Sequence, residues 1–428
     1  FRHCKQLSRA NHPRAMKKIS ALVFILLLGG ISFLPAEENT TASWSHKGSD
    51  IQVDPEVRFG SLKNGMRYAI RKNAEPPGRV SLRLHIAAGS LHEADDQRGV
   101  AHFLEHMVFN GSRNFPDVEN LLGRMQRLGI AFGAHANAYT SFDETVYMLD
   151  LPNLEEETLE LGFDVMRDFG DGALLESKEI DKERGVILSE KRSRDSVEMR
   201  LMEQQFDLLL PDSLITERFP IGTEKVIKEA KRDRFTSFYK DYYIPTNMTF
   251  IAVGDIDPEV YEKRIIDQFS SMRNPDKPGP APKMGTVPEG FKFQAAVFSD
   301  KEVKSDDLAL GFVQKYEKSP DSVANRINKT PLGVANSIIG RRFEILAKKE
   351  GSPISSGSAG RFEWFNAIEF GSIDVTAVEG QWAAAVPVME QELRRALEYG
   401  FTSTELDEVK AEIINRAEQA VKRADTRQ

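Results

Sequence analysis

The segment 273–290 divides the chain, because its sequence RNPDKPGPAPKMGTVPEG carries five prolines and three glycines. Proline fixes φ and lacks a backbone N–H, so a segment this rich in proline and glycine is typical of a linker. On both sides of it the apolar pattern predicts strands, a helix, further strands and then helices. This order suggests a structural duplication, although the two sides share no close sequence repeat.

Before the linker, the pattern predicts helices and strands in alternation. Strands are expected at Met66–Asn73, Val80–Ala87 and Met248–Val253, with two extended stretches within Ile130–Leu151. Helices are expected at Gly99–Phe109, Val118–Leu128, Leu154–Phe169, Glu176–Arg194, Arg232–Tyr243 and Asp257–Met272.

After the linker, strands are expected at Gln294–Phe298 and Asp307–Val313, and helices at Pro331–Lys349, Gln381–Tyr399 and Ser403–Arg423. The last helix runs almost to Gln428 without a stop signal. We therefore expect a longer full-length protein, in which 291–428 is a truncated second domain.

The N-terminal segment 1–36 has the features of a targeting signal. Lys17 and Lys18 precede the apolar run Ile19–Leu34, and small residues end at Ala36. A membrane anchor is the alternative, but a span needs about 20 apolar residues, so we favour a signal peptide and expect no stable anchor. The polar segment 37–50 is predicted to be a flexible leader. The expected destination is across the inner membrane, in a bacterial periplasm.

The amino-acid composition excludes cysteine-based sites and argues against a nucleic-acid partner. The only cysteine, Cys4, lies in the targeting segment, so the remaining chain has no cysteine for a disulfide, zinc or Fe–S site. That segment holds six basic and no acidic residues, so its removal lowers the formal net charge from −8 to −14. A nucleic-acid partner is disfavoured, because phosphate binding needs a basic surface.

The sequence His102-Phe103-Leu104-Glu105-His106 lies in the helix predicted over Gly99–Phe109. Residues four apart share a helix face, so His102 and His106 can bind one metal ion, with Glu105 beside them. Two histidines brought together by chance are the alternative. The order HxxEH reverses that of the common zincins and is the inverzincin pattern.

A third metal ligand must come from elsewhere in the chain. After His106 the only histidine is His135, which can line the site, so a carboxylate is the expected donor. Glu183 and Glu190 are seven residues apart and lie on nearly the same face of a predicted helix. Exposed charged residues are the usual alternative for such glutamates.

The chain resembles the pitrilysin/insulinase family of zinc metallopeptidases, which includes the mitochondrial processing peptidases. The resemblance is dense over 60–270 and looser over 290–428. Its motifs are Gly89-Ser90 with Glu93, GVAHFLEHMVFNGSRNFP (Gly99–Pro116), Ala136–Ser141, Thr145 with Tyr147, Glu183–Glu190, Tyr243–Met248 and Val253–Asp255.

This resemblance implies the fold and the site. The implied fold class is α+β, with two similar domains, each a mixed, mainly antiparallel sheet with helices packed on one side. The catalytic domain is expected at 51–272 and its non-catalytic companion at 291–428. One Zn²⁺ per chain is expected on His102, His106 and Glu190, with Glu183 as a supporting carboxylate. The number of residues between His106 and Glu190 differs from the separation usual in the family, and this count by itself favours Glu183. The sequence around the two glutamates matches the family and favours Glu190 as the ligand.

The implied function is zinc-dependent endopeptidase activity on peptides or unfolded polypeptide segments, with Glu105 as general base toward a metal-activated water. Ala136, Asn137 and Ala138 are expected to pair with extended substrate; an ordinary strand and turn is the alternative. The C-terminal half of the same protein, or a second peptidase-like subunit, is the expected partner. The competing hypotheses are a catalytically weak scaffold or peptide-binding protein on the same fold, and a zinc-handling protein without proteolysis.

Overall fold

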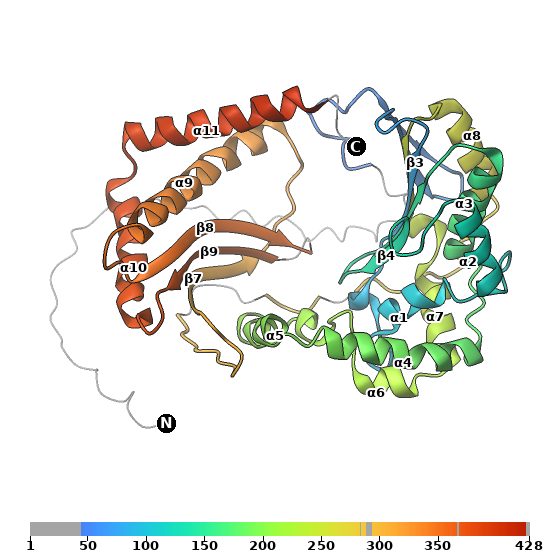
Figure 1. Ribbon diagram of the computed structural model, residues 1–428, viewed down its shortest axis with the longest axis horizontal. Helices are drawn as coiled ribbons and strands as arrows, with labels where there is room; N and C mark the ends of the chain where they lie inside the picture. The colour runs from blue at the N-terminus through green and yellow to red at the C-terminus, as the bar shows by residue number, and fades with distance from the viewer. Residues whose placement is uncertain (1–43, 283, 288–292, 366–367, 425–428) are drawn as a thin grey trace, which may run out of the picture. The chain divides into compact units, whose positions relative to one another are not determined.

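The computed structural model describes residues 44–282, 284–287, 293–365 and 368–424 (Figure 1). The segment 1–36, predicted as a signal peptide, lies outside these ranges, as does the first half of the predicted leader, residues 37–43. None of the helices in the described part of the chain is long and apolar enough to span a bilayer.

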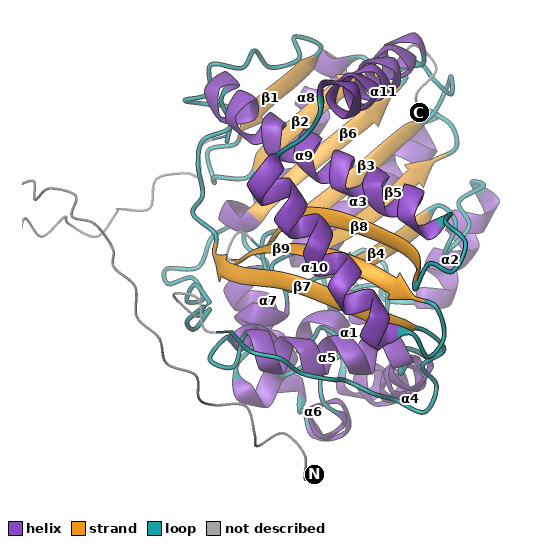
Figure 2. Cartoon of the chain, turned by 90° about the vertical axis from the view of Figure 1, so that its left-hand side faces the viewer, coloured by secondary structure: helices purple, strands orange, loops and turns teal. Residues whose placement is uncertain are grey.

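Six strands form the first sheet: β1 (Val57–Ser61), β2 (Arg67–Lys72), β3 (Val80–Ile86), β4 (Ala136–Thr140), β5 (Thr145–Leu151) and β6 (Met248–Gly254). Their order across the sheet is β1-β2-β6-β3-β5-β4 (Figure 2). The β2–β6 pair is parallel and every other pair is antiparallel. The predicted mixed, mainly antiparallel sheet is therefore confirmed, and β4 lies at its edge.

Helices α1 (Val100–Met107), α3 (Glu156–Asp171) and α8 (Pro258–Phe269) pack on one face of this sheet. The other helices before the linker are α2 (Val118–Arg127), α4 (Ser177–Ser193), α5 (Val197–Leu209), α6 (Glu224–Glu229) and α7 (Arg232–Tyr242). Helix α3 contacts β3 and β5, α8 contacts β2, and α1 contacts β4. Short 3₁₀ turns lie at Ser90–His92, Asp95–Gln97, Leu214–Glu217 and Pro245–Asn247.

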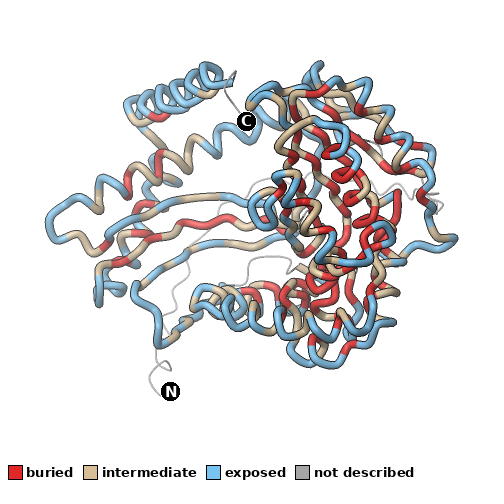
Figure 3. Tube along the Cα trace, turned by 45° about the vertical axis from the view of Figure 1, so that its right-hand side comes forward, coloured by how far each residue is buried: buried red, intermediate tan, exposed pale blue. Residues whose placement is uncertain are grey.

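Strand β3 shows why this face is buried. Its apolar residues alternate with polar ones, and Leu82, Leu84 and Ile86 are fully buried, whereas Arg83 and His85 on the other face are half-buried. Successive side chains of a strand point to opposite faces, so this pattern directs one face to the helices. Figure 3 shows the buried positions running along these strands.

The second sheet contains three strands, β7 (Asp306–Lys315), β8 (Ile354–Trp364) and β9 (Ile368–Ala377), in the order β7-β9-β8. Three helices accompany it: α9 (Val323–Ala347), α10 (Trp382–Tyr399) and α11 (Ser403–Lys422). Helices α9 and α10 pack on the sheet and α11 packs on α9 (Figure 1).

The two sheets share an arrangement that the sequence suggested. In chain order, β7, α9, β8, β9, α10 and α11 match β3, α1, β4, β5, α3 and α4, and α2 is an addition to the first set. The sheet order β7-β9-β8 likewise matches β3-β5-β4. The domain boundaries set at 273–290 stay a prediction.

Two predicted elements differ from the structure. No strand forms at Gln294–Phe298, where Val297 is 93% exposed, because an apolar stretch becomes a strand only when it pairs with a neighbour. Helix α9 begins at Val323 rather than Pro331, since the Ser322 hydroxyl accepts the N–H of Asn325 and starts the helix earlier. Helices α5 and α6 were not predicted.

Candidate metal centre

Helix α1 is fixed at its N-terminus by a buried carboxylate. Glu93 accepts the N–H of Gly99 at 2.9 Å and that of Ala101 at 2.7 Å, which satisfies two of the free donors at the helix start. Gly99 has φ of 103°, and an added Cβ would lie 2.8 Å from the Cα of Gly222. Glycine is required there, because another side chain would strain the backbone and clash.

The two histidines of α1 meet a glutamate of α4. The Nε2 atom of His106 lies 3.3 Å from Oε2 of Glu190, and Nε2 of His102 lies 3.5 Å from the same oxygen. Within the described ranges, these three residues form the one group of His, Cys, Asp or Glu whose ligand atoms all lie within 4.8 Å of one another. These are the three residues that the family resemblance implied as metal ligands, and their metal binding stays a prediction.

The spacing of these atoms suits zinc. Zinc binds nitrogen and carboxylate oxygen at about 2.0–2.1 Å in tetrahedral geometry, which places neighbouring ligand atoms about 3.3–3.4 Å apart. Both measured separations from the Glu190 oxygen lie close to that value. Three protein ligands would leave a fourth position, as catalytic zinc sites do.

Glu183 takes a different place from Glu190. Its Oε1 lies 2.9 Å from Nδ1 of His106, and its Oε2 accepts a hydrogen bond from the amide of Asn110 at 3.0 Å. A carboxylate on the far ring nitrogen fixes the tautomer of a metal-binding histidine and makes it a stronger ligand. In the structure Glu183 therefore contacts Nδ1 of His106, whereas Glu190 lies next to Nε2 of the same ring. Sequence reasoning missed Asn110, although it lies in the motif that continues from the histidines.

The electrostatics of the group favour a bound cation. The pKa of Glu190 falls to about 2, mainly through His102, with Arg194 and His106 adding to the effect against the opposing effect of burial. Burial alone would lower the pKa of His106, but the hydrogen bond with Glu183 and the charges of the surrounding glutamates raise it. Three carboxylates around two imidazoles therefore attract positive charge.

Glu105 lies beside this group and is 9% exposed. Its Oε2 accepts a hydrogen bond from the Thr140 hydroxyl at 2.6 Å, so the glutamate of α1 is joined to the end of β4. Sequence reasoning quoted Thr140 only as part of a motif, because a contact across 35 residues has no local sequence signal.

The three residues predicted to bind substrate lie on β4. Ala136 is buried, Ala138 is half-buried and Asn137 is exposed, as expected for alternation along an edge strand. His135, considered as a lining residue, accepts the N–H of Ala131 through Nδ1 at 3.0 Å in the turn before β4. This hydrogen bond within the turn stabilises the turn before β4.

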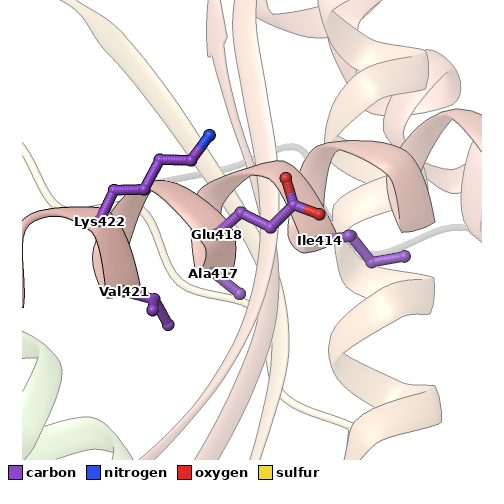
Figure 4. A pocket seen from close by; sticks show the side chains of 5 residues that line it. All are labelled: Ile414, Ala417, Glu418, Val421 and Lys422. Atoms are coloured by element: carbon purple, nitrogen blue, oxygen red, sulfur yellow. The ribbon is translucent and has the colours of Figure 1, made fainter.

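A shallow hollow lies elsewhere, on α11. It is lined by Ile414, Ala417, Glu418, Val421 and Lys422 (Figure 4). It shares no residue with the histidine–glutamate group, so the chemistry described above does not depend on it.

The HxxEH order on helix α1, here with a glutamate of α4 beside the histidines, is the pattern of the inverzincin class of zinc peptidases. Residues 68–216 match the insulinase domain of peptidase family M16, and residues 229–413 match the M16 inactive domain. The chain belongs to this insulinase/pitrilysin family, as its motifs implied.

Curated relatives include probable zinc proteases called PqqL. The chain is 38% identical over 260 residues to the Haemophilus influenzae protein, which covers 61% of this chain and 27% of that protein. It is 29% identical over 401 residues to the Escherichia coli protein, covering 94% and 42% respectively. The chain thus spans well under half the length of these relatives.

A solved structure shares the fold over most of the chain. The crystal structure of the first half of the periplasmic protease PqqL from Escherichia coli superposes with a TM-score of 0.79 at 29% identity. The match covers 88% of this chain and 80% of that one. The predicted α+β fold class is therefore confirmed.

Proposed function

We propose that this chain carries the active site of a zinc endopeptidase that hydrolyses peptides or unfolded polypeptide segments. The observation that carries the proposal is the convergence of His102, His106 and Glu190 beside the buried Glu105. A catalytically weak scaffold would be expected to lack one of these four side chains, and all four are present.

Each residue has a role in the proposed mechanism. His102, His106 and Glu190 would hold one zinc ion, and Glu183 would orient His106 through its Nδ1. Bound zinc supplies a Lewis acid that polarises a peptide carbonyl and lowers the pKa of water. Glu105 accepts the proton of the attacking water at its carboxylate and returns it to the leaving nitrogen.

Edge strand β4 is the proposed substrate-binding element. Among the strands of the described chain β4 pairs with β5 alone. Ala136 also bonds back to the preceding turn through Ala131 and Gly133, so the edge open to an extended peptide lies after Ala136. Main-chain hydrogen bonds of this kind give affinity that depends little on the sequence of the peptide. We therefore expect Ala136–Ala138 to accept varied peptides. Photo-cross-linking of a bound peptide should label residues near 134–140; labelling confined to distant segments would refute this assignment.

Location and partners are proposed from the relatives. One of them is described as a periplasmic protease of Escherichia coli, and we propose the same compartment here, reached through the N-terminal apolar run. Because the relatives are longer than this chain, we also propose that a second peptidase-like half, in the same protein or in another subunit, completes the enzyme.

The experiment that tests the activity is cleavage of an unstructured peptide library by the zinc-loaded full-length protein. We expect cleavage that stops after chelation and returns when zinc is added back. A zinc-handling protein would bind the metal without cleaving any peptide, and cleavage that survives complete removal of metal would contradict the proposed site.

A further inference from the structure

Thr140 joins the proposed substrate strand to the proposed general base. It is the last residue of β4, and its hydroxyl donates to Oε2 of Glu105 at 2.6 Å. We propose that Thr140 is a positioning residue, which holds the Glu105 carboxylate in the orientation needed for proton transfer. This inference rests on the proposed function and adds a residue to it.

The register of the sheet places Thr140 on the helix-covered face. Thr140 lies opposite Thr145 in β5, and Thr145 lies opposite Ile86 in β3, which is fully buried. Directly opposed residues of antiparallel strands share a face, so the Thr140 side chain points to the side on which α1 packs. The neighbours on this face of β4 are Ala136 and Ala138, whose small side chains let α1 approach the strand closely.

The other hydroxyl groups near Glu105 do not hydrogen-bond to its carboxylate in the described part of the chain. The hydroxyls of Tyr147 and Tyr243 lie 2.6 Å apart, and both side chains are buried. They therefore bond to each other. Over the described ranges, Thr140 supplies the one hydrogen bond to the Glu105 carboxylate, and it occupies Oε2.

A hydrogen bond to one carboxylate oxygen restricts the rotamers of a glutamate. Without it, the side chain regains conformational freedom, and the reactive geometry is populated less often. The zinc ligands do not depend on Thr140, since their contacts come from α1 and α4 alone. Loss of the hydroxyl should therefore slow turnover without releasing metal.

The test compares Thr140→Val, Thr140→Ser and a matched control, Thr145→Val, in the zinc-loaded full-length protein. Thr145 lies opposite Thr140, but its hydroxyl donates to the carbonyl of Ala88 at 2.9 Å rather than to Glu105. We expect Thr140→Val to lower kcat by about 10- to 100-fold with KM and zinc affinity within about twofold of wild type. Thr140→Ser should restore kcat to within about threefold of wild type, and Thr145→Val should lower Tm with little change in kcat.

Crystal structures of the Thr140 variants give a readout that does not depend on turnover. We expect the Glu105 carboxylate to leave its position in Thr140→Val and to keep it in Thr140→Ser. An unmoved carboxylate and an unchanged kcat in Thr140→Val would overturn the inference, as would a kcat lost equally in Thr140→Ser. If the wild-type protein cleaves no peptide, the proposed function fails, while the crystal structures still decide whether Thr140 positions Glu105.

Discussion

His106 is contacted by carboxylates at both ring nitrogens. Glu190 lies 3.3 Å from Nε2 and Glu183 lies 2.9 Å from Nδ1, and Asn110 holds the second oxygen of Glu183. With Nδ1 occupied by Glu183, Nε2 is the nitrogen presented to a metal ion. The order Asn110, Glu183, His106 is therefore a chain of hydrogen bonds that ends at the proposed zinc ion.

Glu183→Gln tests this chain. The substitution keeps the size of the side chain but removes the charge behind His106, so we expect zinc affinity to fall by about tenfold or more. Competition titration with a chromophoric chelator measures it. Glu179→Gln on the same helix is the matched control, because within the described ranges the Glu179 carboxylate bonds to the exposed Lys182 alone. Equal affinities in the two variants would contradict a role for Glu183 in metal binding.

The sequence could specify part of the site at this scale. His102, Glu105 and His106 were predictable because helix periodicity alone fixes their common face. Glu183 and Glu190 could not be separated by that periodicity, since both lie on nearly one face of α4; the structure places them on opposite sides of the His106 ring. Asn110 and Thr140 were not predicted, because their partners are 73 and 35 residues away.

At the scale of elements, the start of α1 depends on a close approach of two backbones. Gly99→Ala would force a side chain onto φ of 103° and onto the backbone of Gly222. We expect a loss of about 1–3 kcal/mol in the free energy of unfolding. Gly333→Ala in α9 is the matched control. An added Cβ there meets no atom within 4 Å, and a gain of up to about 1 kcal/mol is expected. Equal changes in chemical denaturation would contradict the argument.

Helices α9 and α11 are joined by an ion pair whose effect depends on pH. Arg342 donates to Glu405 at 2.6 Å, and this contact, with help from Thr402, lowers the pKa of Glu405 to about 2. A carboxyl with a lowered pKa stabilises the fold above its unfolded pKa, and the effect disappears as the pH falls toward the folded value. Glu405→Gln should therefore cost about 1–2 kcal/mol near pH 6 and less by pH 3. A cost that is constant across denaturation curves from pH 6 to 3 would exclude this ion pair as its source.

The elements that were predicted wrongly share a physical reason. Apolar periodicity locates the buried face of a helix, but the start of α9 is set by the Ser322 cap, and Pro331 is accommodated inside the helix. The sequence around Val297 has strand-like composition, yet pairing depends on a neighbouring strand far away in the sequence. Long elements with one buried face, such as α3 and β3, were predicted well.

At the scale of the whole molecule, the proposed metal ligands lie in the first of the two similar sets of elements, and their histidine pair has no counterpart in the second. Helix α9 corresponds to α1, but no histidine follows His135 in the chain. The second set of elements therefore cannot repeat the histidine pair, in agreement with its match to the M16 inactive domain. A single zinc ion per chain is the expected stoichiometry.

The proposed second half leads to a prediction about activity. All proposed zinc ligands lie on α1 and α4, so this chain should bind zinc as tightly as the full-length protein. Cleavage should be much slower, because a substrate held by this chain without the second half is oriented poorly. Parallel zinc titrations and peptide assays check this. Full activity of the chain alone would show that no second half is needed.

The central claim is that Glu105 moves the proton in a zinc-dependent peptide hydrolysis. The most direct measurement is the rate of peptide cleavage by Glu105→Gln beside its zinc content, in the full-length protein. We predict that the variant keeps one zinc ion and its fold but loses at least about 100-fold in kcat, within the range expected for a lost general base. Cleavage at the wild-type rate by the zinc-loaded variant would contradict the account.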